Sequence, residues 1–141
     1  MPRGRGRLAL TCAPRLEPAP PRQARGRDAE RAGRDAEEAA CLRLAEDGWE
    51  IFARRVRTPR GEIDIAAERA GLVAIVEVKR RATHDDAAAS VSPRQQARLM
   101  AAAELLLARH PARGSAGVRF DVLLVDAGGR VERIEDAFRL M

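Results

Sequence analysis

The stretch LVAIVEVK, residues 72–79, decides the fold that we predict for this chain. Its first five residues are apolar without interruption, which is typical of a central β-strand buried on both faces. Glu77 and Lys79 follow at its end, and residues two apart in a strand share a face. Lys79 is the one lysine among 26 basic residues. Because lysine and arginine are not interchangeable where a point charge approaches one oxygen, Lys79 is a candidate functional residue.

Hydrophobic periodicity and turn signals predict two helices and five strands around this segment. The predicted elements are a helix over 29–47, strands over 49–57, 62–67 and 72–79, a polar loop over 80–91, a helix that begins at Pro93, strands over 119–126 and 131–134, and a helical turn over 136–138. Ser92 is expected to cap the second helix, with Gln95 completing a capping box. The order α-β-β-β-α-β-β predicts an α/β fold whose mixed sheet contains one parallel pair, joined by a right-handed crossover.

The hairpin formed by strands 62–67 and 72–79 brings a second carboxylate to Glu77. Alternation points Ile63 and Ile65 to one side of the sheet, and Asp64 to the other. Two registers remain open, one that places Asp64 opposite Ile75 and one that places it opposite Glu77. Either register puts Asp64 on the face of Glu77 and Lys79, with neighbouring positions ~4.5–8 Å apart.

Two carboxylates this close repel each other, and their burial is costly unless a cation compensates. Mg²⁺ is typically held by one or two carboxylates together with waters and a substrate phosphate. A bound metal can activate water for attack on a phosphodiester, and a nearby ammonium can neutralise the developing charge. Asp64, Glu77 and Lys79 could supply such a site. A salt bridge at the end of a strand explains the pattern equally well.

Several other side chains have two possible roles. Glu37 borders the apolar face of the first helix, so it either reaches over the sheet edge into the same site or is a solvated acid. Four arginines, Arg54, Arg55, Arg57 and Arg60, either contact phosphates or guard an edge strand with charge. Asp121 is expected to be a buried partner of an arginine, and Trp49 to belong to the core.

The basic character of the chain belongs to its N-terminal residues. The net charge is +5 and the pI is about 10.7, but residues 1–27 alone carry +6, which leaves residues 28–141 at −1. We therefore predict a disordered Arg/Pro-rich tail over 1–27, either a nucleic-acid-binding arm or a dispensable extension, and one domain over 28–141. The apolar runs are too short to span a membrane, and Cys12 and Cys41 make no disulfide framework. These features predict a cytoplasmic protein.

The motif Gly61-Glu62-Ile63-Asp64-Ile65, followed by Val76-Glu77-Val78-Lys79, resembles the YraN-like family of small bacterial proteins. The resemblance covers residues 30–138 and includes Gly33 with Ala36-Glu37 and Ala40, Gly48-Trp49, Arg119-Phe120-Asp121-Val122 and Asp136-Ala137-Phe138. It implies the PD-(D/E)xK, restriction-endonuclease-like fold that Holliday-junction resolvases also use. The chain departs from the family at Gln95, where a lysine is usual, and in the loop 80–91, which lacks a Phe-Gly pair.

The resemblance also implies roles for individual residues. Asp64 and Glu77 would bind Mg²⁺ (or Mn²⁺), Lys79 would be the catalytic lysine, and Glu37 would be an additional helix acid. Arg57, Arg60, Arg80 and Gln95 are candidate nucleic-acid contacts. The expected function is a Mg²⁺-dependent endonuclease that cleaves DNA, including branched or repair intermediates. The alternative is a non-catalytic nucleic-acid-binding or adaptor protein that keeps the fold. We expect DNA as the partner, no membrane, no small-molecule cofactor, and a monomer or homodimer.

Overall fold

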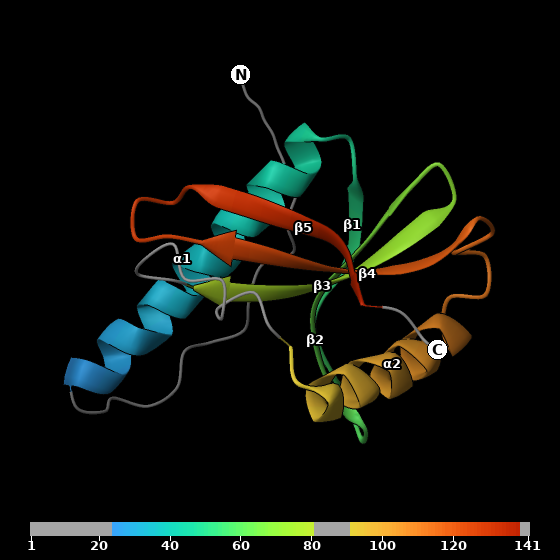
Figure 1. Cartoon of the computed structure of the whole chain (residues 1–141), viewed down its shortest axis with the longest axis horizontal. Helices are drawn as coiled ribbons and strands as arrows, with labels where there is room; N and C mark the ends of the chain where they lie inside the picture. Colours follow the sequence, from blue (N-terminus) through green and yellow to red (C-terminus); the bar gives the residue numbers. More distant parts are fainter. Residues whose placement is uncertain (1–23, 81–90, 139–141) are drawn as a thin grey trace.

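The computed structural model describes residues 24–80 and 91–138, and within them it confirms the predicted order of elements. Both helices and all five strands are present (Figure 1). Their bounds are α1 Ala24–Glu46, β1 Glu50–Thr58, β2 Gly61–Arg69, β3 Leu72–Arg80, α2 Pro93–Ala108, β4 Gly117–Val125 and β5 Val131–Phe138. Neither helix of this described part is long and apolar enough to cross a membrane.

The five strands form one mixed sheet in the order β1-β2-β3-β4-β5. β3 and β4 are parallel, and α2 makes the crossover between them, while the other neighbouring strands are antiparallel. β3 is the central strand. Its residues Val73, Ala74, Ile75 and Val76 are each at most 1% exposed, which confirms that the strand is buried on both faces.

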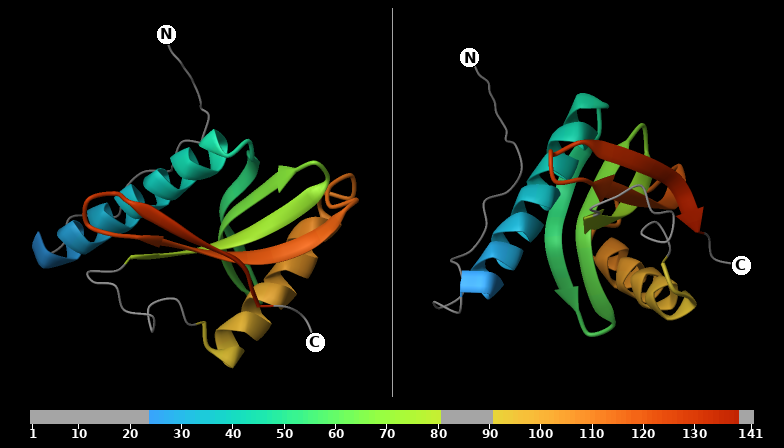
Figure 2. Two further views of the ribbon diagram at one scale, coloured as in Figure 1. Left: turned by 45° about the horizontal axis from the view of Figure 1, so that its top comes forward. Right: turned by 60° about the vertical axis from the view of Figure 1, so that its left-hand side comes forward.

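The two helices cover opposite faces of the sheet (Figure 2). α1 packs Ala36, Ala40, Cys41 and Leu44 onto one face, where Ile65, Val76 and Leu123 also lie. α2 packs Leu99, Ala102, Ala103 and Leu106 onto the other, together with Ile75, Val122 and Leu124. Because each helix buries one stripe, the sheet between them is covered on both sides.

α1 begins at Ala24, five residues before the predicted start of the first helix, and therefore includes the last residues of the predicted tail. Residues 1–23 lie outside the described part of the chain, as do residues 81–90 of the predicted polar loop. The proposed tail over 1–27 and its disorder thus stay predictions.

The register of the β2–β3 hairpin is the second of the two that were predicted. Arg69 pairs with Leu72 and Ile65 with Val76, a register that places Asp64 opposite Glu77. Ala70 and Gly71 alone make the turn. Both have positive φ, 52° and 83°, as the type I′ turns of two-residue hairpins require.

The predicted alternation along β2 is wrong at Ile63. Ile65 packs with α1, whereas Ile63 packs with α2, although regular alternation would place both on one side. The neighbouring strand β1 is irregular: its register shifts between Ile51 and Ala53, and Arg55 has a φ of 51°. Such irregularities increase the local twist of a strand pair, and we attribute the change of side at Asp64 to them.

The predicted helical turn over 136–138 is also wrong, because β5 continues to Phe138. Phe138 pairs with Phe120 of β4, and their rings stack with centroids 4.9 Å apart. Asp136 has a φ of 55°, and its N–H donates to Asp121 Oδ1. The ring contact and this hydrogen bond keep the segment in the sheet through a local irregularity.

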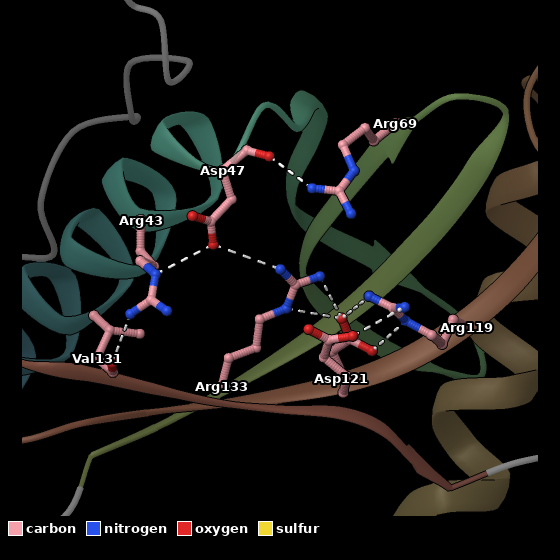
Figure 3. Close-up of polar contacts among 8 residues, drawn as sticks. Arg43, Asp47, Arg69, Arg119, Asp121, Val131 and Arg133 are labelled. Atoms are coloured by element: carbon pink, nitrogen blue, oxygen red, sulfur yellow. Dashed lines mark hydrogen bonds and ion pairs between the residues drawn. The ribbon is translucent and has the colours of Figure 1, made fainter.

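Asp121 is buried and pairs with arginines, as the sequence predicted. It is 1% exposed and accepts two hydrogen bonds from Arg119, at 2.9 and 3.0 Å, and one of 2.9 Å from Arg133 Nη2. Figure 3 shows Arg133 extending between Asp121 and Asp47. The guanidinium groups of Arg119 and Arg133 also lie 5.4 and 4.9 Å from the ring centroid of Trp49, which is buried as predicted.

We predict that Asp121→Ala lowers the free energy of unfolding by about 3–5 kcal/mol, because it leaves buried guanidinium groups without their counter-charge. Urea denaturation measures the loss. Glu135→Ala is the matched control, since Glu135 also pairs with Arg119 but is 59% exposed. It should cost less than about 1 kcal/mol. Equal losses in the two variants would contradict the prediction.

Candidate active site

Asp64 and Glu77 meet where β2 and β3 separate. The last pair of the β2–β3 ladder on this side is Ile65 with Val76. Beyond it, Asp64 Oδ2 accepts a 2.8 Å hydrogen bond from the backbone N–H of Val78. The carboxyl groups of Asp64 and Glu77 lie within hydrogen-bonding reach of each other. The side chain of Asp64 thus bridges the two strands at the point where they diverge.

Partial burial disfavours the state in which both carboxyl groups are ionised. The pKa of Glu77 is raised from 4.5 to about 7, mainly by burial and next by the charge of Asp64. The pKa of Asp64 is also raised, again mainly by burial, although the Val78 N–H opposes the shift. Without a metal the two carboxyl groups therefore keep a proton up to near neutral pH.

Lys79 provides a positive charge on the same side of β3 as Glu77. Val78 between them packs toward α1, so Glu77 and Lys79 face the side of α2. Lys79 is half-buried, and its ammonium lowers the pKa of Glu77, against the effect of burial. Glu77 and Lys79 therefore share a side of the sheet, and Asp64 lies within hydrogen-bonding reach of Glu77.

Gln95 enters the site from the first turn of α2. Ser92 caps this helix as predicted, with Oγ accepting from the Gln95 N–H at 3.1 Å. The side chain of Gln95 turns to the sheet, where its amide nitrogen donates to Glu77 Oε2 at 2.7 Å. We expected this side chain to complete a capping box or to contact nucleic acid. It orients a carboxylate of the site, and its contact with nucleic acid stays a prediction.

Glu37 is near the site but is not a solvated helix acid. It is 6% exposed, and its carboxylate accepts hydrogen bonds from Arg54 Nη2 at 2.8 Å and from Arg55 Nε at 3.1 Å. Its charge still raises the pKa of Asp64. Spacing alone did not reveal these partners, because Arg54 lies 17 residues further along the chain.

The other predicted contacts lie on the surface. Arg57, Arg60 and Arg80 are all exposed, and Arg57 pairs with Glu62 at 3.3 Å. The interpretation overlooked Arg94 and Arg98, which are exposed on either side of Gln95 at the start of α2. Their spacing of four residues places them on one face of a helix, and that signal was available in the sequence.

The donor set fits a hard divalent cation. Two carboxylates held together at a strand edge are the oxygen ligands that Mg²⁺ and Mn²⁺ accept, and such sites usually contain only one or two of them. A cation there would replace the retained proton. Glu37 is engaged by arginines, and the described residues contain no cluster of three or more His, Cys, Asp or Glu side chains suited to a metal. Asp64 and Glu77 are accordingly the two candidate ligands.

Comparison with protein-family models places these residues in a known group. Residues 36–125 match the model described as uncharacterised protein family UPF0102. The chain belongs to the UPF0102 family. This confirms the YraN-like resemblance and the PD-(D/E)xK fold that it implied. The matched region includes Glu37, Asp64, Glu77, Lys79 and Gln95.

Individual UPF0102 proteins are similar over most of their length. A relative from Granulibacter bethesdensis is 57% identical over 116 residues, which are 82% of this chain and 73% of the relative. One from Rhodopseudomonas palustris (strain BisA53) is 48% identical over 111 residues, or 79% of this chain and 85% of the relative. One from Bradyrhizobium diazoefficiens is 50% identical over 95 residues, or 67% and 71% of the two chains.

The raised pKa of Glu77 predicts how the stability of the metal-free UPF0102 protein depends on pH. Its contribution to stability is fully present below pH 4.5 and is lost as the pH rises to about 7, because the unfolded carboxyl group ionises first. Glu77→Gln should remove this loss and be more stable than the wild type at pH 8 by about 1–2 kcal/mol, after allowance for solvent screening.

Denaturant unfolding in EDTA at pH 5 and pH 8 measures this difference. Glu104→Gln, at an exposed position of α2, is the control and should follow the wild type. A wild-type protein that loses no stability relative to Glu77→Gln between these pH values would contradict the burial of the carboxyl pair.

Proposed function

We propose that this UPF0102 protein is a Mg²⁺-dependent endonuclease that cleaves phosphodiester bonds of DNA, with branched or repair intermediates as the class of substrate. The observation that carries the proposal is the half-buried Asp64–Glu77 pair, which keeps a proton where a cation would fit. An amide and an ammonium face the same pair. A purely structural salt bridge would not require two carboxyl groups within hydrogen-bonding reach.

Each residue has a separate role in this proposal. Asp64 and Glu77 would hold Mg²⁺ or Mn²⁺, and the Val78 N–H and the Gln95 amide keep their oxygens in place. When bound, the metal would activate a water and withdraw charge from the scissile phosphate. Lys79 is the catalytic lysine, because its ammonium can approach a phosphate oxygen and stabilise the charge that develops there.

Glu37 is not a third metal ligand in this proposal. Arg54 and Arg55 bind its carboxylate, so it contributes a fixed negative charge that acts on Asp64. We place the activity in the cytoplasm, where DNA is present and where the buried Cys41 stays reduced. A single copy carries the complete carboxylate pair, so the proposal requires no particular oligomeric state.

Incubation of the purified protein with flap, junction, duplex and single-stranded DNA tests the proposal. Cleavage is expected with Mg²⁺ or Mn²⁺ and not with EDTA. Lys79→Ala should reduce the rate by at least about 100-fold, the size expected when one group that stabilises transition-state charge is removed. Arg109→Ala, which removes an exposed charge at the far end of α2, should cleave like the wild type.

Two results would overturn the assignment. Cleavage that survives in Lys79→Ala would show that the reaction does not use this site. DNA binding without cleavage of any substrate, and unaffected by divalent metal, would support the alternative of a non-catalytic nucleic-acid-binding or adaptor protein.

A further inference from the structure

Two exposed arginines frame the point where α2 reaches the carboxyl pair. Arg94 and Arg98 are both exposed, and the first turn of α2 contains no acidic residue. Residues four apart on a helix are neighbours, with Cβ atoms ~5–6 Å apart. Gln95 directly follows Arg94 and donates to Glu77 at 2.7 Å, so the helix turn that carries these arginines is the one that reaches the site.

The tip of the β1–β2 hairpin adds a third arginine. A Cβ atom on Gly61 would lie 3.4 Å from both the Cβ and the carbonyl oxygen of Arg98, so the tip rests on α2. Arg60 immediately precedes Gly61 and is exposed. A strand-to-helix contact therefore brings together arginines that are more than thirty residues apart in the sequence.

These three side chains, Arg60, Arg94 and Arg98, are available to an external anion. Within the described part of the chain, none of them has a carboxylate at ion-pair distance, whereas Arg57 on the same hairpin is paired with Glu62. Three exposed arginines without a carboxylate partner among the described residues, beside a candidate phosphodiesterase site, match the charge of a nucleic-acid backbone.

We propose that Arg60, Arg94 and Arg98 form a phosphate-binding ridge that receives one strand of DNA and leads it to Glu77. The ridge rests on the proposed function for its role beside a cleavage site. The large apolar side chains that are exposed among the described residues are Leu42 and Val118, on α1 and β4, so neither belongs to the ridge. Its contacts are to phosphates, and it binds without sequence preference.

Fluorescence anisotropy with a labelled DNA oligonucleotide in EDTA tests the ridge without cleavage. The full chain is used throughout, so residues 1–27 contribute equally to every variant. Arg94→Ala with Arg98→Ala should weaken binding about tenfold or more and reduce the slope of log K against log salt concentration by about 1.5, since each lost phosphate contact removes 0.7–0.9. Arg60→Ala should give a smaller loss in the same direction.

Arg109→Ala is the matched control on the same helix and should bind like the wild type. The ridge is overturned if the double variant keeps the wild-type affinity and salt slope, if Arg109→Ala loses as much, or if the wild type binds phosphatidylglycerol vesicles and not DNA. Its failure is separable from that of the nuclease. Cleavage with unchanged binding in the ridge variants overturns the ridge alone, whereas ridge-dependent binding without cleavage overturns the nuclease alone.

Discussion

The backbone N–H of Val78 donates a hydrogen bond to the side chain of Asp64, just beyond Ile65 and Val76, the last residue pair of the β2–β3 ladder. This hydrogen bond holds a carboxylate at the place where two strands diverge, and the register of the hairpin sets Glu77 opposite it. Burial then raises the pKa of both groups. The site thus depends on a hydrogen bond from the backbone to Asp64. The fold brings two acids together, and neighbouring polar groups such as the Gln95 amide bind to them.

The two helices contribute to the site from opposite faces of the sheet. α1 supplies Glu37, whose charge is balanced by Arg54 and Arg55, while α2 supplies Gln95, which orients Glu77. A separate network on the α1 face joins Asp121 of β4 to Arg133 of β5. Because none of the contacts of this network among the described residues involves Glu77, one set of buried charges can stabilise the fold while another set remains available for chemistry.

The sequence predicted the elements well because their signals are local: the apolar run of β3, the Ser92 cap and the turn residues. It also predicted the side shared by Glu77 and Lys79 and a register that sets Asp64 opposite Glu77, because strand alternation and hairpin register are nearly local rules. The sequence-based prediction was wrong where contacts between residues far apart in the chain determine the local structure. The pairing of Phe138 with Phe120 keeps the C-terminal segment in the sheet, and Arg55 lies beside a twist that moves Ile63 to the other face. Arg54 and Arg55 bind Glu37 although they lie 17 and 18 residues further along the chain, and helix or strand periodicity cannot predict contacts between different elements at such separations.

The central claim is that Asp64 and Glu77 hold a divalent cation in place of their retained proton. Anomalous diffraction from crystals soaked in Mn²⁺ tests it most directly. The account predicts a single peak at about 2–2.5 Å from carboxylate oxygens of both residues, which disappears in Asp64→Asn. A carboxyl pair that stays metal-free at saturating Mn²⁺ and pH 8, or a peak that survives in Asp64→Asn, would contradict the account.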